Sequence, residues 1–184
     1  WSSDVCSSDL DSRFVKGEIL VGNLRIIKND EEIKNLRKAS EIIDDVVKGL
    51  VEYIRPGLLE RDIKKKIEEL CLEKGASGLS FDPIVASGSN SSMPHYNQDT
   101  GVIQERDLVL LDLGCRYNGY CSDTTRTIFI GEPTEKQRKV YTAVLEANLA
   151  AEAFVQEGIA AEKVDRKARE VIDKAGLGQY FITR

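Results

Sequence analysis

Apolar residues recur at intervals of three and four between residues 29 and 54, which is the period of a helix with one buried face. Asn29 and, three residues later, Glu32 match the capping-box pattern that begins a helix, and Arg55-Pro56-Gly57 ends it. We therefore predict one long helix here. Its buried face comprises Ile33, Leu36, Ala39, Ile43, Val46, Leu50 and Ile54.

A second helix is predicted from about Glu60 to Lys74, followed by Gly75 in the left-handed conformation that often ends a helix. Its lysine side chains are interpreted as a solvated outer face. The side chains expected to point inward are Ile63, Ile67 and Leu70.

Two further helices are predicted near the C-terminal end. Thr134 caps a helix that runs to about Gln156, and Ala161 to Ala175 form another that ends at Gly176. The last residues, Phe181 to Arg184, are typical of a strand that is beginning, so we expect the natural protein to continue beyond them.

Three segments between these helices favour strands. Phe81 to Ala86 is expected to form a short strand, followed by a polar loop from Ser87 to Pro94. Leu108 to Leu113 is an apolar run typical of a strand that is covered on both faces. Thr124 to Ile130 is rich in β-branched residues and is predicted to form the next strand.

Asn118-Gly119 is the strongest short signal for a two-residue hairpin turn, and it fixes the register of the two strands around it. In this register Asp112 faces Thr125, and Asp123 lies two residues before Thr125 on the same face. The β-carbons of the two aspartates are then about 6–8 Å apart. A β-bulge would shift the register by one residue and separate them.

An aspartate inside an apolar strand needs a positive partner, because an unpaired buried carboxylate is unstable. Two neighbouring carboxylates increase that need. A divalent metal ion would satisfy Asp112 and Asp123 together, whereas an ion pair with Arg126 is the alternative that the sequence leaves open.

Length and charge narrow the class of protein. The chain has 184 residues, a length that suits one domain. Its formal net charge is −5, so the overall charge does not favour binding to nucleic acid. No apolar run is long enough to cross a membrane, so a cytoplasmic location is expected. Residues 1–10 are interpreted as an extraneous or disordered tail, and residues 11–28 as a connector with a short extended piece.

Four motifs together resemble the metallopeptidase family with the pita-bread fold. They are Phe81 to Gly88, Pro94-His95, Asp112-Leu113-Gly114 and Gly119 to Thr127. The residues of these motifs are most similar to those of the Xaa-Pro branch, which contains aminopeptidase P and prolidase. The resemblance implies an α+β fold in which residues 29–184 form the N-terminal half of the catalytic domain, an antiparallel β-hairpin sheet covered by helices.

The resemblance also assigns roles to individual residues. Asp112 and Asp123 correspond to metal ligands, His95 to a residue that contacts substrate near the scissile bond, and Phe81 to an aromatic that borders the substrate pocket. The family site holds two divalent metal ions with five protein ligands, of which one His and two Glu are absent from this chain. Mn²⁺ is the expected metal, with Co²⁺ or Zn²⁺ as alternatives.

The implied activity is hydrolysis of the bond before proline by a metal-activated water, with a peptide substrate that has proline at its second position. The 184-residue chain alone is expected to be inactive. The alternatives are a methionine aminopeptidase-like enzyme and a metal-free creatinase-like or non-catalytic member of the fold. The resemblance is also compatible with a homodimer. No nucleic-acid or membrane partner is expected.

Overall fold

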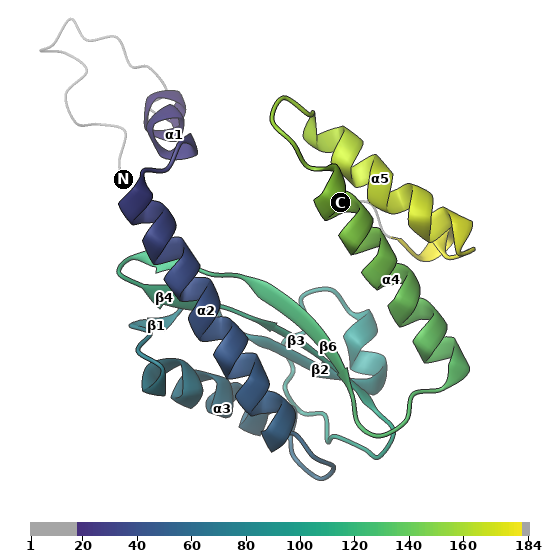
Figure 1. The fold of residues 1–184 in the computed structure, drawn as a ribbon. Helices are drawn as coiled ribbons and strands as arrows, with labels where there is room; N and C mark the ends of the chain where they lie inside the picture. Colours follow the sequence, from purple (N-terminus) through teal and green to yellow (C-terminus); the bar gives the residue numbers. More distant parts are fainter. Residues whose placement is uncertain (1–17, 182–184) are drawn as a thin grey trace, which may run out of the picture.

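Two long helices, α2 (Asp30–Tyr53) and α3 (Glu60–Glu73), cover one face of two small antiparallel sheets (Figure 1). The structure is a computed structural model that describes residues 18–181. Strands β1, β4 and β5 form one sheet, and β2, β3 and β6 form the other. Their bounds in chain order are β1 (Gly78–Leu79), β2 (Ile84–Ser87), β3 (Leu108–Leu113), β4 (Cys115–Tyr117), β5 (Tyr120–Cys121) and β6 (Thr124–Phe129).

The N-terminal end of α2 confirms the predicted capping box. The Asn29 side chain accepts from the Glu32 backbone N–H at 3.0 Å, and the Glu32 carboxylate accepts from the Asn29 N–H at 2.8 Å. The buried face follows the predicted period from Ala39 onward, but Ile33 is 43% exposed and Leu36 is only half-buried, while Ile42 is buried in addition. Ile33 lies in the first turn of α2, before the helix reaches the fully buried positions that begin at Ala39.

Helix α3 confirms the predicted helix, and Gly75 after it has a φ of 91°. The prediction that all its lysines are solvated is wrong for Lys64, whose side chain is only 12% exposed. Its ammonium group lies 3.0 Å from Asp82 and 2.8 Å from Asp99. Both partners are distant in sequence, so no local pattern reveals this ion pair.

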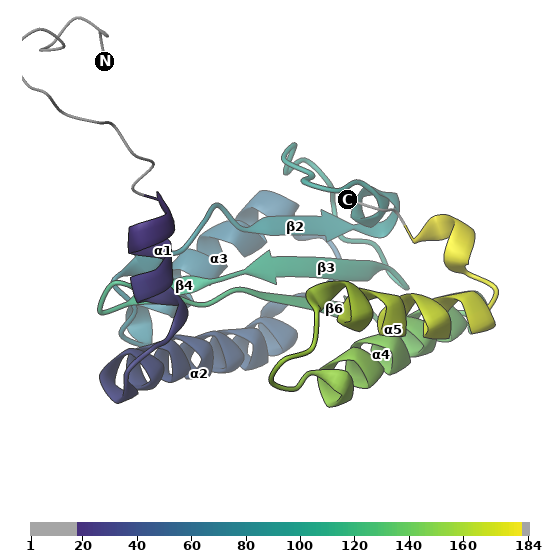
Figure 2. The same cartoon turned by 90° about the horizontal axis from the view of Figure 1, so that it is seen from above.

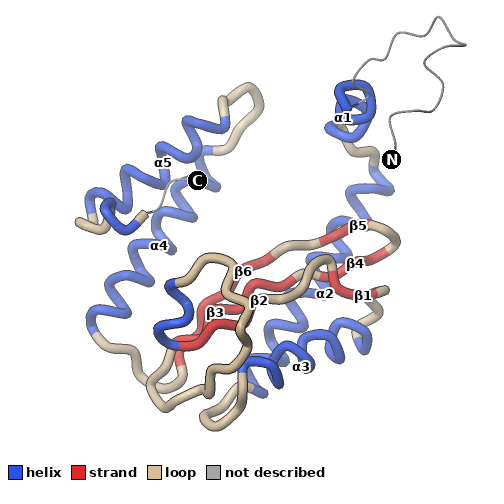
Figure 3. Tube along the Cα trace, turned by 180° about the vertical axis from the view of Figure 1, so that it is seen from behind, coloured by secondary structure: helices blue, strands red, loops and turns tan. Residues whose placement is uncertain are grey.

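Within residues 18–181, helices cover the central strand β3 on one face only. Val109, Leu111 and Leu113 are fully buried against α2 and α3, whereas the alternating residues Leu110 and Asp112 are partly exposed. The predicted covering of both faces is therefore wrong for the described chain. Figure 3 shows this side, with the strands in front of α2 and the loop that follows β2 in front of part of the sheet.

The hairpin forms in the predicted register. Tyr117 pairs with Tyr120, and Asn118 and Gly119 have φ angles of 48° and 83°, as a primed two-residue turn requires. The strand predicted from Phe81 begins only at Ile84, since Pro83 directly before it has no N–H for a ladder. The polar loop that follows contains a short 3₁₀ segment, η1 (Gly88–Ser92).

Helices α4 (Glu135–Phe154) and α5 (Ala161–Lys174) pack against each other as an antiparallel pair beside the sheet (Figure 2). Thr134 caps α4 as predicted, and its side chain accepts from the Gln137 N–H at 3.3 Å. The small cluster that joins the two helices comprises Ala143, Ala147 and Ile172. A 3₁₀ turn, η2 (Gly178–Tyr180), follows.

The connector prediction needs one correction. Residues Glu18–Ile26 form helix α1, where an extended piece was expected. The single Gly22 does not break it, since one glycine inside a helix costs only about 1 kcal/mol relative to alanine. The predicted tail at 1–10, the rest of the connector up to residue 17 and the predicted strand beyond Phe181 lie outside the described residues. None of the helices in 18–181 combines the length and apolar character needed to span a bilayer.

Candidate active site

Asp112 lies near the end of β3, on the face of the sheet that α2 and α3 leave uncovered. It pairs with Thr125 of β6, as the hairpin register predicts. The Thr125 hydroxyl donates to Oδ1 of Asp112 at 2.9 Å. This hydrogen bond orients the carboxylate, and sequence reasoning gave Thr125 only as a facing residue, without a role.

Asp123 lies between β5 and β6 and is exposed. The strand pairs on both sides of it keep one register, from Arg116 with Cys121 to Leu113 with Thr124. No β-bulge therefore shifts the register where the chain passes from one sheet to the other. The same-face arrangement of Asp112 and Asp123 remains a prediction that this register supports.

Arg126, the alternative cation for Asp112, lies near a different carboxylate. Arg126 pairs with Leu111 in the ladder, so it lies on the opposite face of β6 from Thr125. Its guanidinium group is 3.7 Å from the Asp44 carboxylate on α2. In the described part of the chain Asp112 forms no ion pair, which leaves its carboxylate available to a metal ion.

A cavity of about 260 Å³ brings Asp112 and His95 together on this open face. Thr125 also lines it, and its sheet side is formed by the side chains of Ile84, Ala86 and Leu110. His95 is exposed, follows η1 and has a φ of 56°, in the left-handed region. The structure thus places the predicted substrate-contacting residue beside one of the two predicted metal ligands.

Phe81 is not brought into this cavity. It is half-buried, and its ring lies close to Gly114, where Cε1 would be 2.9 Å from a β-carbon added to the glycine. The ring therefore packs at the junction between β3 and β4 in the described chain. Its predicted role at the border of the substrate pocket remains a prediction.

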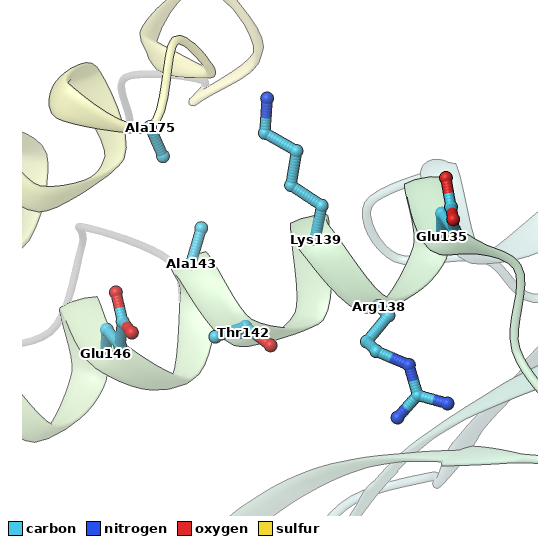
Figure 4. Close-up of a pocket in the computed structure, with 7 residues that line it drawn as sticks. All are labelled: Glu135, Arg138, Lys139, Thr142, Ala143, Glu146 and Ala175. Carbon is cyan, nitrogen blue, oxygen red and sulfur yellow. The ribbon is translucent and has the colours of Figure 1, made fainter.

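A larger hollow of about 450 Å³ lies at α4 and α5, and it does not gather reactive groups. Figure 4 shows Lys139 extending toward α5 while Arg138 points to the other side of α4. Its remaining lining is mostly the polar surface of one helix. We therefore place the candidate site at the smaller cavity.

The residues present fit part of a metal site. Two carboxylates are hard oxygen donors, which suit ions such as Mn²⁺. Within residues 18–181 no three His, Cys, Asp or Glu side chains converge as a complete ligand set. Asp112 and Asp123 can therefore supply only a share of the ligands that a dinuclear centre needs.

Glu60 is a functional candidate that sequence reasoning missed. Its side chain is fully buried at the first position of α3. Burial alone would raise the pKa of its carboxyl, but hydrogen bonds from Asn90, Ser87, Tyr96 and Gly101 outweigh that effect and lower the pKa. No sequence signal identifies it, because its partners lie 27 to 41 residues away.

Comparison with known proteins gives a consistent picture. The model of metallopeptidase family M24 matches residues 34–184. The Xaa-Pro dipeptidase of Pyrococcus furiosus is 44% identical over 169 residues, which are 92% of this chain and 49% of that protein. The Xaa-Pro dipeptidase of Lactobacillus helveticus is 41% identical over 165 residues, 89% of this chain and 45% of that protein.

Solved structures agree with the sequence comparisons. The prolidase from Pyrococcus furiosus superimposes with a TM-score of 0.87 at 44% identity, covering 90% of this chain and 49% of that one. The X-Pro aminopeptidase from Thermotoga maritima gives a TM-score of 0.85 at 34% identity, covering 88% and 46%. The chain spans about half the length of the curated relatives it matches.

Proposed function

The chain belongs to metallopeptidase family M24, and from this premise we propose that it supplies part of the active site of an Xaa-Pro exopeptidase. Relatives at 41–44% identity are named Xaa-Pro dipeptidases, which supports this substrate class. The proposed substrate is a peptide with proline at its second position. The dipeptidase and the aminopeptidase forms both fit the comparisons.

In this proposal Asp112 and Asp123 hold divalent metal ions, with Mn²⁺ as the preferred metal. When bound, the ions would polarise the scissile carbonyl and activate the attacking water. Thr125 keeps the Asp112 carboxylate oriented toward the site through its 2.9 Å hydrogen bond. Residues outside this chain would complete the ligand set.

The observation that carries the proposal is the shared cavity of His95 and Asp112. In that place the imidazole can donate a hydrogen bond to the carbonyl oxygen of the scissile bond as negative charge develops there. The apolar side chains of Ile84, Ala86 and Leu110 offer a dry surface for a proline ring. The cavity therefore combines a metal side, a donor and an apolar side within one small volume.

The proposal is tested with a chimera in which this chain replaces the 169 matched residues of the Pyrococcus furiosus Xaa-Pro dipeptidase. Manganese-dependent release of proline from an Xaa-Pro dipeptide would support the function. A folded chimera that binds manganese but cleaves no Xaa-Pro substrate would contradict it. Light scattering on the same sample measures whether the expected homodimer forms.

The 184-residue chain alone is expected to show no useful hydrolysis of Xaa-Pro peptides. Two carboxylates cannot hold two metal ions together with an activated water. The measurement is proline release by the purified chain at saturating Mn²⁺, compared with buffer alone. Metal-dependent turnover by the isolated chain would show that the missing ligands are not needed.

Replacing His95 by alanine in the chimera should reduce kcat/KM by about 10²–10³-fold, as expected for one well-placed donor. Bound manganese should barely change, because His95 is proposed to contact substrate and not metal. Asn97→Ala, an exposed site on the same loop, is the matched control. Loss of the metal in His95→Ala would identify His95 as a ligand and contradict the assigned role.

A further inference from the structure

The carboxylate of Glu60 is completely buried, yet neutral donors surround it. Oε1 accepts from the Ser87 N–H at 2.8 Å, the Ser87 hydroxyl at 2.9 Å and the Asn90 amide at 3.0 Å. Oε2 accepts from the Tyr96 hydroxyl and the Gly101 N–H, both at 2.7 Å. Within the described residues it has no ion pair, so five hydrogen bonds satisfy the charge.

Gly101 shows that the loop is shaped around this carboxylate. A β-carbon at position 101 would lie 2.4 Å from Oε1 and 2.7 Å from Oε2 of Glu60. In return, the Glu60 N–H donates to the Gly101 carbonyl at 2.9 Å. Only a residue without a side chain permits this close and reciprocal contact.

The four residues that donate hydrogen bonds to Glu60 flank His95 in the sequence. Ser87 and Asn90 precede it, and Tyr96 and Gly101 follow it. His95 itself adopts a left-handed φ of 56°, which costs a residue with a side chain some free energy and persists only when neighbouring contacts impose it. Tyr96, the next residue, is 4% exposed and fixed by its hydrogen bond to Glu60.

Lys64 adds a second attachment one turn later on the same face of α3. Its ammonium group binds Asp99 at 2.8 Å, on the C-terminal side of His95, and Asp82 at 3.0 Å, before β2. Asp99 also has a left-handed φ, of 55°. Helix α3 therefore fixes both ends of the loop that presents His95.

We propose that Glu60 is a positioning residue of the candidate active site. Its carboxylate accepts the hydrogen bonds that hold residues 87–101 in their conformation. Through Tyr96, it determines the position of the His95 imidazole relative to Asp112. This inference rests on the proposed function for its catalytic consequence. The geometric part concerns the loop alone and is tested without catalysis.

The isosteric change Glu60→Gln tests the geometric part in the chain as it stands. In the glutamine variant, an NH₂ group replaces one of the two carboxylate oxygens and faces the donors that bound that oxygen. Part of the loop must therefore detach. We expect hydrogen exchange at the Ser87 and Gly101 amides to accelerate about tenfold or more, as losing a charged hydrogen bond implies. Glu68→Gln on the exposed face of α3 is the matched control.

His95 is the only histidine in the sequence, so its imidazole gives one unambiguous NMR signal. Glu60→Gln should move or split that signal, and Glu68→Gln should leave it unchanged. Tyr96→Phe, which removes one donor and keeps the ring, should move it in the same direction by a smaller amount. This second variant keeps the test decisive if Glu60→Gln does not fold.

The catalytic consequence is tested by a double-mutant cycle in the chimera. If Glu60 acts through His95, Glu60→Gln lowers kcat with little change in KM or bound manganese, and it slows His95→Ala no further. An unchanged His95 signal, or a uniform acceleration of exchange over the whole chain, would overturn the inference. An inactive chimera would contradict the proposed function while the exchange and NMR results still decide the role of Glu60.

Discussion

Asp112→Asn and Asp123→Asn are each expected to remove bound manganese from the chimera and to lower kcat/KM by more than about 10³-fold. Loss of one hydrogen-bond donor commonly costs 10²–10³-fold, and loss of the ion removes a larger effect. Asparagine keeps the shape of the side chain in both variants and, at position 112, also an acceptor for the Thr125 hydroxyl. The expected loss therefore reports the ligand charge and not a disrupted fold.

The measurements are metal content after gel filtration and the rate of proline release. Asp44→Asn is the matched control, since it removes an exposed carboxylate on α2, on the other side of the sheet. Thr125→Val should give an intermediate result, because a residue that orients a ligand commonly contributes 10–100-fold to metal affinity. Full metal content in either aspartate variant would exclude that residue as a ligand.

Gly114→Ala is expected to destabilise the chain by about 3 kcal/mol or more, at the upper end of the cost of overpacking. The added β-carbon would lie 2.1 Å from the Ser122 carbonyl oxygen and 2.3 Å from the Ser80 hydroxyl. These two atoms also bond to each other at 2.8 Å, so neither can move freely. The chain must open between the segments that carry Asp112 and Asp123.

Urea unfolding followed by circular dichroism measures this effect. Gly22→Ala is the matched control, because nothing lies within 4 Å of its added β-carbon and alanine favours a helix. It should leave stability unchanged or slightly higher. In the chimera, Gly114→Ala should also reduce bound manganese, and wild-type stability in this variant would contradict the close packing described here.

The register of the hairpin could be predicted because its signal is local. Asn118-Gly119 admits the positive φ angles of a tight turn, and the alternation of the strands then fixes the facing pairs over several residues. The pairing of Asp112 with Thr125 followed from that turn alone. The capping residues Asn29 and Thr134 predicted the starts of α2 and α4 for the same reason, since each acts within one turn.

The coverage of β3 could not be predicted in this way. A run rich in leucine is compatible with burial on one face or on both, and only the placement of α2 and α3 decides which. Glu60 and Lys64 were missed for a related reason. Each is an ordinary helix residue in sequence, and its importance arises from partners that the fold brings from far along the chain.

The distance along the chain between Glu60 and its partners also bears on the order of folding. Helix α3 and the hairpin at Asn118 need only neighbouring residues, whereas closing the loop onto Glu60 joins residues 27 to 41 apart. Such closure loses more chain entropy before any contact forms. We therefore expect residues 87–101 to dock onto Glu60 after α3 and the Asn118–Gly119 hairpin have formed, so His95 reaches its place later than these local elements.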